Sequence, residues 1–158
     1  MKVEREVRIA APPEAVWAFL WDVPRLAACI PGARDVRTVE AGKRYTAVVA
    51  EKVGPFKVQF PLEIEVLETR PPARLRARAG GRDASVDALV KVDLDVALAP
   101  LDGGTALSLS AEIAVLGKLG TLGHGVIVRK GAEIVDRFGA AVREQLEGQA
   151  ASSHRNES

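Results

Sequence analysis

The chain has 158 residues, a length that suits one domain with its own buried core. Lysine and arginine number 22 and aspartate and glutamate 21, so the formal net charge of +1 argues against a nucleic-acid-binding protein. The single cysteine excludes an internal disulfide bond. The charged N-terminus differs from a signal peptide, and no apolar run approaches the roughly 20 residues of a membrane span. We therefore expect a soluble cytoplasmic protein.

The first part of the chain predicts one strand and two short helices. Residues 2–9 form the strand, which ends before Pro12 and Pro13. A helix follows, because proline is tolerated in a first helical turn and because apolar residues recur at helical spacing over residues 15–20. A second, shorter helix covers residues 22–29.

The middle of the chain alternates between apolar and polar residues, a period of two that is typical of strands. We predict strands over residues 33–40, 45–53, 56–66, 74–79, 86–98 and 107–115, separated by glycine- or proline-containing turns. The clearest alternation is in residues 56–66, where every even position is apolar. Pro61 lies within this strand, so we expect a sheet edge or a bulge there.

From about Gly117 to Gly148 the apolar period changes to 3.6, which predicts a long helix. Strands joined by hairpins pair antiparallel, and the apolar faces of sheet and helix must bury each other. We therefore predict an α+β helix-grip fold, a curved seven-stranded antiparallel sheet around a long C-terminal helix. The domain spans residues 1–148, and residues 149–158 form a polar tail that we expect to be disordered.

Few residues are suited to chemistry. The predicted inward positions of the sheet are valine, alanine, leucine, isoleucine and phenylalanine, so we expect no catalytic residue, no metal site and no cofactor. Cys29 is either a small core residue or a reactive thiol, and the sequence assigns it no neighbouring base. His124 is either structural or solvent-exposed, with contact to a ligand as the alternative.

A run of glycines marks the start of the predicted long helix, residues 117–125. Each glycine inside a helix costs about 1 kcal/mol relative to alanine, so the run needs a physical reason. On a helical projection Gly120, Gly123 and Gly131 share the apolar face. Two interpretations remain: a cavity between helix and sheet, or close packing together with a later start of the helix.

The first interpretation predicts an apolar ligand-binding cavity between the first half of the long helix and the sheet. A dry apolar cavity favours an apolar ligand. The predicted ligand-binding residues, with Ile30 and Gly80 near the mouth, are Ile30, Phe56, Val58, Gly80, Leu116, Leu119, Gly120, Gly123 and Ile127. Leucine at both Gly120 and Gly123 is expected to fill this cavity.

Several short motifs carry a family resemblance. They are Pro12-Pro13-Glu14-Ala15-Val16-Trp17, Asp22-Val23-Pro24-Arg25-Leu26, Cys29-Ile30-Pro31-Gly32, Lys52-Val53-Gly54-Pro55-Phe56 and a glycine-punctuated helix that reaches Phe138. Over about residues 1–147 the chain resembles the CoxG family of carbon monoxide dehydrogenase subunits. That family belongs to the START-like (SRPBCC) helix-grip superfamily, so the resemblance implies the same fold as the periodicity.

The resemblance also implies a non-catalytic carrier or accessory protein of a molybdenum hydroxylase such as carbon monoxide dehydrogenase, with a quinone or lipid-like ligand. It implies recruitment of that enzyme to the membrane, hence a transient contact at the inner membrane face. Some family members end in a membrane-binding segment, whereas residues 152–158 here are polar. Two alternatives remain: a ligand-free adaptor for the same enzyme, and a cyclase- or dehydratase-type enzyme, which would need inward polar groups.

Overall fold

The structure is a computed structural model that describes residues 1–157, with side chains for residues 1–148. The predicted disordered tail, residues 149–158, lies outside the fully described part of the chain, so its disorder stays a prediction.

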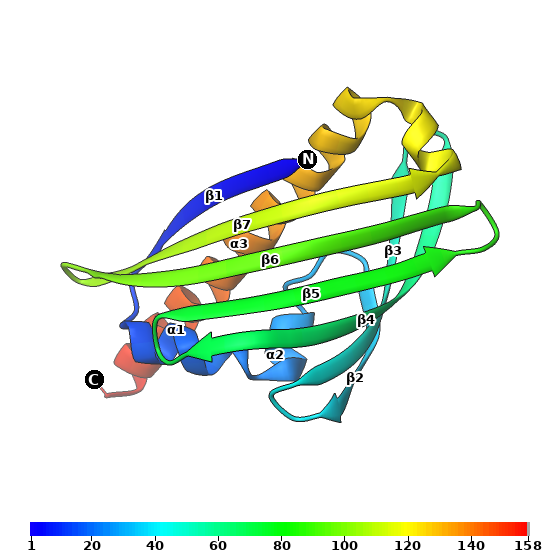
Figure 1. Ribbon diagram of the computed structural model, residues 1–158. Helices are drawn as coiled ribbons and strands as arrows, with labels where there is room; N and C mark the ends of the chain where they lie inside the picture. The colour runs from blue at the N-terminus through cyan, green and yellow to red at the C-terminus, as the bar shows by residue number, and fades with distance from the viewer. Residues whose placement is uncertain (158) are drawn as a thin grey trace.

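The order of elements confirms the predicted helix-grip fold (Figure 1). The strands are β1 (Lys2–Ile9), β2 (Ala33–Glu40), β3 (Arg44–Val53), β4 (Phe56–Arg70), β5 (Arg74–Asp83), β6 (Ala88–Leu101) and β7 (Gly104–Gly117). The helices are α1 (Pro13–Leu20), α2 (Val23–Ala27), the 3₁₀-helix η1 (Lys118–Leu122) and α3 (His124–Glu157).

All seven strands form one antiparallel sheet in the order β1-β7-β6-β5-β4-β3-β2. Strands β2 to β7 pair with their neighbours in sequence, and β1 pairs with β7, so β1 and β2 are the two edges. Figure 1 shows α3 running along one face of the sheet, with α1 and α2 near its C-terminal part. Among the described residues, none of the helices has both the length and the apolar character needed to cross a bilayer.

The structure shows neither an edge strand nor a bulge at Pro61, but β4 has a partner on only one side at this residue. Strand β4 lies inside the sheet, between β3 and β5. Its pairing with β5 begins at Leu62, opposite Gly81, so Pro61 and the residues before it pair with β3 alone. A missing N–H therefore leaves no β5 partner unsatisfied there. The irregular pairing of β4 with β5 lies further along, between Val66 and Glu68.

Strand β5 continues past the glycine pair that was predicted to end it at Ala79. Gly80 and Gly81 lie inside β5, which ends at Asp83. A Cβ atom added at Gly81 would clash with the backbone oxygen of Pro61. The close approach of β4 thus requires glycine at this position.

Before Leu62, β4 has no partner strand on its β5 side, and there the Asp83 carboxylate accepts the hydrogen bond of a β4 backbone N–H. Its carboxylate accepts hydrogen bonds from the Gln59 N–H at 2.7 Å, the Ser85 N–H at 2.9 Å and the Ser85 hydroxyl at 2.6 Å. The hydrogen bonds from Ser85 and Gln59 lower the pKa of the Asp83 carboxyl below its usual 3.8.

Helix α3 begins at His124, later than the predicted Gly117. Strand β7 runs on to Gly117, where φ is 85°, and η1 follows until Gly123, where φ is 98°. Both angles favour glycine because other residues rarely adopt them. The prediction that Gly120 and Gly123 lie on the inward face of the helix is therefore wrong, because they precede it.

Two separate apolar clusters form the core, one near each end of the described part of α3. We call them the α1 cluster and the η1 cluster. The α1 cluster consists of Ile9, Ala11, Val16, Phe19, Leu20, Cys29, Val96, Leu98, Leu107, Leu109, Val142 and Leu146. The η1 cluster consists of Val53, Val58, Phe60, Ala88, Leu119 and Ile127.

Candidate ligand-binding site

The face of the sheet that packs against α3, here the concave face, is identified by Ile113. A Cβ atom added at Gly131 of α3 would lie 3.0 Å from Cδ1 of Ile113. Val92 lies directly opposite Ile113, and Ala79 lies directly opposite Val92. Residues directly opposite each other in a sheet project from the same face, so this row continues across the concave face.

Two such rows cross the concave face between the α1 cluster and the η1 cluster, and together we call them the apolar strip. The strip consists of Ile113, Val92, Ala79, Ile64 and Tyr45 in one row, and Val115, Val90, Gly81, Leu62 and Ala47 in the other. Ala47 is buried, but the other nine remain partly accessible although they face the helix side. Apolar side chains in a filled core would be buried. The strip is therefore an accessible apolar surface inside the grip.

The structure brings together four of the predicted ligand-binding residues. Val58, Leu119 and Ile127 are buried in the η1 cluster, and Phe56 packs against it. These side chains pack on one another and close this end of the grip. Their contact with a ligand stays a prediction.

The other five predicted residues lie elsewhere. Leu116 is 53% exposed near the end of β7, next to the concave-facing Val115. Gly120 lies in η1, Gly123 separates η1 from α3, and Ile30 lies partly buried in the turn between α2 and β2. Gly80 lies between two concave-facing residues of β5, so a side chain at this position would project from the opposite face.

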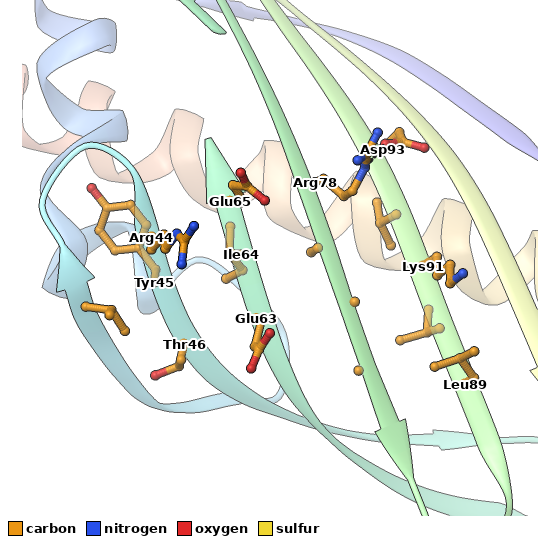
Figure 2. Close-up of a pocket in the computed structure, with 16 residues that line it drawn as sticks. Arg44, Tyr45, Thr46, Glu63, Ile64, Glu65, Arg78, Leu89, Lys91 and Asp93 are labelled. Carbon is orange, nitrogen blue, oxygen red and sulfur yellow. Dashed lines mark hydrogen bonds and ion pairs between the residues drawn. The ribbon is translucent and has the colours of Figure 1, made fainter. Parts of the chain in front are cut away.

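Gly80 instead lines a hollow of about 810 Å³, which we call the outer hollow because its charged lining residues project from the opposite face. The same hollow also borders the strands at six strip residues, namely Tyr45, Ile64, Ala79, Gly81, Val90 and Val92. Figure 2 shows its charged side chains along neighbouring strands. Three cations and three anions line it: Arg44, Arg78, Lys91, Glu63, Glu65 and Asp93. Nε of Arg78 lies 3.0 Å from Oδ1 of Asp93. Covering these charges with an apolar molecule would cost desolvation energy, so the apolar strip is the better site for an apolar ligand.

Glu51 is a functional candidate that the sequence analysis missed. It lies opposite the concave-facing Val58, and its side chain is only 14% exposed. Oε2 of Glu51 lies 2.9 Å from Nζ of Lys130 on α3, and Oε1 lies 3.8 Å from Nη1 of Arg137. The hydrogen bond with Glu51 raises the pKa of Lys130. The clue in the sequence is the series Ala47, Val49, Glu51, Val53, in which a carboxylate interrupts the apolar alternation.

Both Lys130 and Arg137 have a second anionic partner. Glu133, one helical turn from each, lies 3.5 Å from Lys130 and 3.7 Å from Arg137. We call Glu51, Lys130, Glu133 and Arg137 the ion-pair network. It joins β3 to α3 beside the apolar strip.

Neither Cys29 nor His124 lies in an environment that suits a reactive side chain. Cys29 is buried in the α1 cluster, where burial raises the pKa of its thiol, and Sγ donates to the Arg25 carbonyl oxygen at 3.5 Å. A thiol with a raised pKa is a poor nucleophile at neutral pH. His124 is exposed at the start of α3. Among the described residues, no group of three His, Cys, Asp or Glu side chains could hold a metal ion.

The fold is that of a START-like helix-grip protein. It is similar to a START superfamily protein from Mycobacterium smegmatis, with a TM-score of 0.74 at 12% identity over 94% of this chain and 98% of that one. A conserved protein from Geobacillus kaustophilus gives a TM-score of 0.85 at 19% identity over 94% and 96%. A protein from Thermus thermophilus gives 0.70 at 19% identity over 94% and 99%.

A sequence model of the CoxG family of carbon monoxide dehydrogenase subunits matches residues 6–147. The chain therefore belongs to the CoxG family, as its motifs predict. None of the curated proteins matches it significantly.

Proposed function

We propose that this chain is a non-catalytic carrier or accessory protein that binds an apolar ligand on the apolar strip. The observation that carries the proposal is the accessibility of nine strip residues on a face that a helix covers. Apolar surface of this kind is stabilised by a ligand that removes it from water, at about 25 cal/mol per Å². The ligand in this proposal is a quinone or lipid-like molecule.

The family description supports the choice of partner. In our proposal the chain assists a molybdenum hydroxylase such as carbon monoxide dehydrogenase. It acts in the cytoplasm, with transient contact at the inner face of the membrane when it takes up or releases the ligand. It needs no cofactor and no nucleic acid.

The proposal includes no catalytic turnover by this chain. The carboxylates on the concave face of strands β3 to β7 are Glu51 and Asp83. Glu51 is paired with Lys130 and Arg137, and Asp83 accepts hydrogen bonds from Gln59 and Ser85. Neither arrangement offers a general acid and base to one substrate.

Two neighbouring substitutions on opposite faces of β5 test the site. Ala79→Leu fills the apolar strip, and Gly80→Leu fills the outer hollow; a Cβ atom at Gly80 meets only the Val90 carbonyl oxygen, at 3.5 Å. Binding of 2-methyl-1,4-naphthoquinone is measured by native mass spectrometry and tryptophan fluorescence. Ala79→Leu is expected to weaken binding at least tenfold and Gly80→Leu to leave it unchanged. The opposite pattern would move the site to the outer hollow.

The ligand-free adaptor is a second candidate, favoured by the packing of Val58, Leu119 and Ile127 where a cavity was predicted. It predicts that the chain binds its molybdenum hydroxylase without any small molecule. Sedimentation of the purified chain with the purified enzyme, with and without the naphthoquinone, distinguishes the two. No naphthoquinone binding together with a stable complex would support the adaptor.

A further inference from the structure

We propose that the ligand reaches the apolar strip between α3 and β3, and that the ion-pair network closes this passage when the strip is empty. This inference rests on the proposed function, because it concerns access to the same site. It follows from what bounds the strip on each of its four sides.

Both ends of the strip are closed by apolar packing. The α1 cluster lies at one end and the η1 cluster at the other, and their members are buried. Opening either end would expose apolar side chains to water, at about 25 cal/mol per Å².

The side of α3 that faces β1 is closed by close approach of the α3 backbone to valine side chains of β1. A Cβ atom added at Gly139 would lie 2.7 Å from Cγ2 of Val7, and one added at Gly131 would lie 3.7 Å from Cγ2 of Val3. Two glycines on one helix face thus let α3 lie directly on β1. A gap on this side would require the whole helix to move away.

The side of α3 that faces β3 is bridged by long charged side chains. The ion pairs from Glu51 to Lys130 and Arg137 span this side. Lys130 and Arg137 are seven residues apart on α3, about 10 Å along the helix axis. A planar ring system can pass through an opening of that length once the side chains move.

The ion-pair network can open without exposing an apolar cluster and without moving a whole helix. Arg137 and Glu133 are 55% and 50% exposed, so water reaches them when the pairs separate, whereas Glu51 and Lys130 are 14% and 19% exposed and depend on retained partners. When Glu51 swings away, Lys130 and Arg137 keep Glu133 as their partner, at 3.5 and 3.7 Å. Neither cation is left unpaired, and Glu51 alone exchanges its partners for water.

The test measures the rates of 2-methyl-1,4-naphthoquinone binding and release by stopped-flow fluorescence. Glu51→Gln is expected to raise both rates at least fivefold and to change Kd less than twofold. Adding Lys130→Met to Glu51→Gln is expected to raise the rates no further, because both substitutions remove the same ion pair. Raising salt from 0.05 to 0.5 M is expected to accelerate exchange in the parent protein and not in Glu51→Gln.

The matched control removes an ion pair on the other side of α3. Nε of Arg5 on β1 lies 2.7 Å from Oδ1 of Asp136 on α3. Arg5→Gln is expected to leave both rates unchanged, and melting temperatures confirm that each variant is folded.

Each outcome distinguishes the two proposals. Failure of the parent protein to bind the naphthoquinone overturns the proposed function and the passage together. Binding with unchanged rates in Glu51→Gln overturns the passage alone. A rise in Kd without faster exchange overturns the passage as well, because Glu51 would then contact the ligand. Faster exchange in Arg5→Gln would move the passage to the β1 side.

Discussion

Helix α3 is held to the sheet in two different ways along its two sides. Against β1 it lies close, with Gly131 and Gly139 facing valine side chains. Against β3 it is bridged by Glu51, Lys130 and Arg137. Contact with β1 therefore depends on glycines that carry no side chain, whereas contact with β3 depends on long charged side chains.

This difference shows how a helix-grip domain can be stable and still leave apolar surface accessible. Close packing on one side fixes the height of the helix above β1 and β7. On the other side, where the bridge is polar, apolar residues of β4 and β6 stay partly accessible on the concave face, among them Leu62, Ile64 and Val92. Four predictions test this difference between the two sides of α3, in order of decreasing expected effect.

Filling the β1 side is expected to have the largest effect. Gly139→Leu places a side chain where its first carbon already meets Val7, so overpacking is expected to lower the free energy of unfolding by about 1–3 kcal/mol. Gly148→Leu is the control, because nothing lies within 4 Å of a Cβ atom there; it is expected to be neutral or stabilising by up to about 1 kcal/mol. Urea unfolding measures both. Equal stability of the two variants would contradict close packing on β1.

Asp83 is the second carboxylate on the concave face, and its effect on stability can be compared with that of Glu51. Asp83→Asn removes charge-assisted hydrogen bonds from Gln59 and Ser85 and is expected to cost about 1 kcal/mol at neutral pH. Because the folded-state pKa lies below the usual 3.8, this contribution is present above about pH 4 and is lost as the pH falls through the folded-state pKa. Unfolding curves of both proteins from pH 7 to 2 are therefore expected to converge in acid. A difference in unfolding free energy that persists at pH 2 would show that the ionised Asp83 carboxylate is not its source.

Breaking the β3 side is expected to cost less than filling the β1 side. Glu51→Gln is expected to lower the free energy of unfolding by about 1 kcal/mol or less, because Lys130 keeps Glu133 and the released groups reach water. The same urea experiment in 0.05 and 0.5 M salt measures it, and the difference from the parent protein shrinks in high salt. A loss as large as that of Gly139→Leu would mean that the ion-pair network holds the helix in place.

Alkaline pH is expected to give the smallest effect. The pKa of Lys130 is raised by its hydrogen bond with Glu51, so the stabilisation is present below the usual 10.5 and is lost as the pH rises through the folded-state pKa. The parent protein is thus expected to lose a few tenths of a kcal/mol more than Lys130→Met between pH 9 and 11.5. Parallel loss in both proteins would contradict the pairing.

Much of the fold could be predicted from the sequence because alternation and helical periodicity are local. The even positions of residues 56–66 do face inward, as their apolar character indicates. The start of α3 could not be located in the same way. A run of glycines fits a helix facing a cavity or a break before the helix, and the positive φ angles of Gly117 and Gly123 depend on how β7 meets η1.

The candidate site could be predicted only in part because it depends on contacts between distant elements. The face to which Gly80 belongs is set by the pairing of β5 with β4 and β6. The role of Glu51 depends on where α3 places Lys130, 79 positions further along the chain. The apolar strip itself consists of residues that look like any buried strand, and its accessibility depends on how far α3 lies from β4 to β6.

Binding of an apolar ligand on the apolar strip can be observed residue by residue with methyl NMR. Methyl resonances of Leu62, Ile113 and Val115, which do not line the outer hollow, report on the strip, and those of Leu107 and Val142 report on the α1 cluster. On titration with 2-methyl-1,4-naphthoquinone, we expect saturable shifts that are largest for the three strip residues. Shifts confined to Val39 and Leu89, which line the outer hollow, or no saturable shift at all, would contradict binding on the strip.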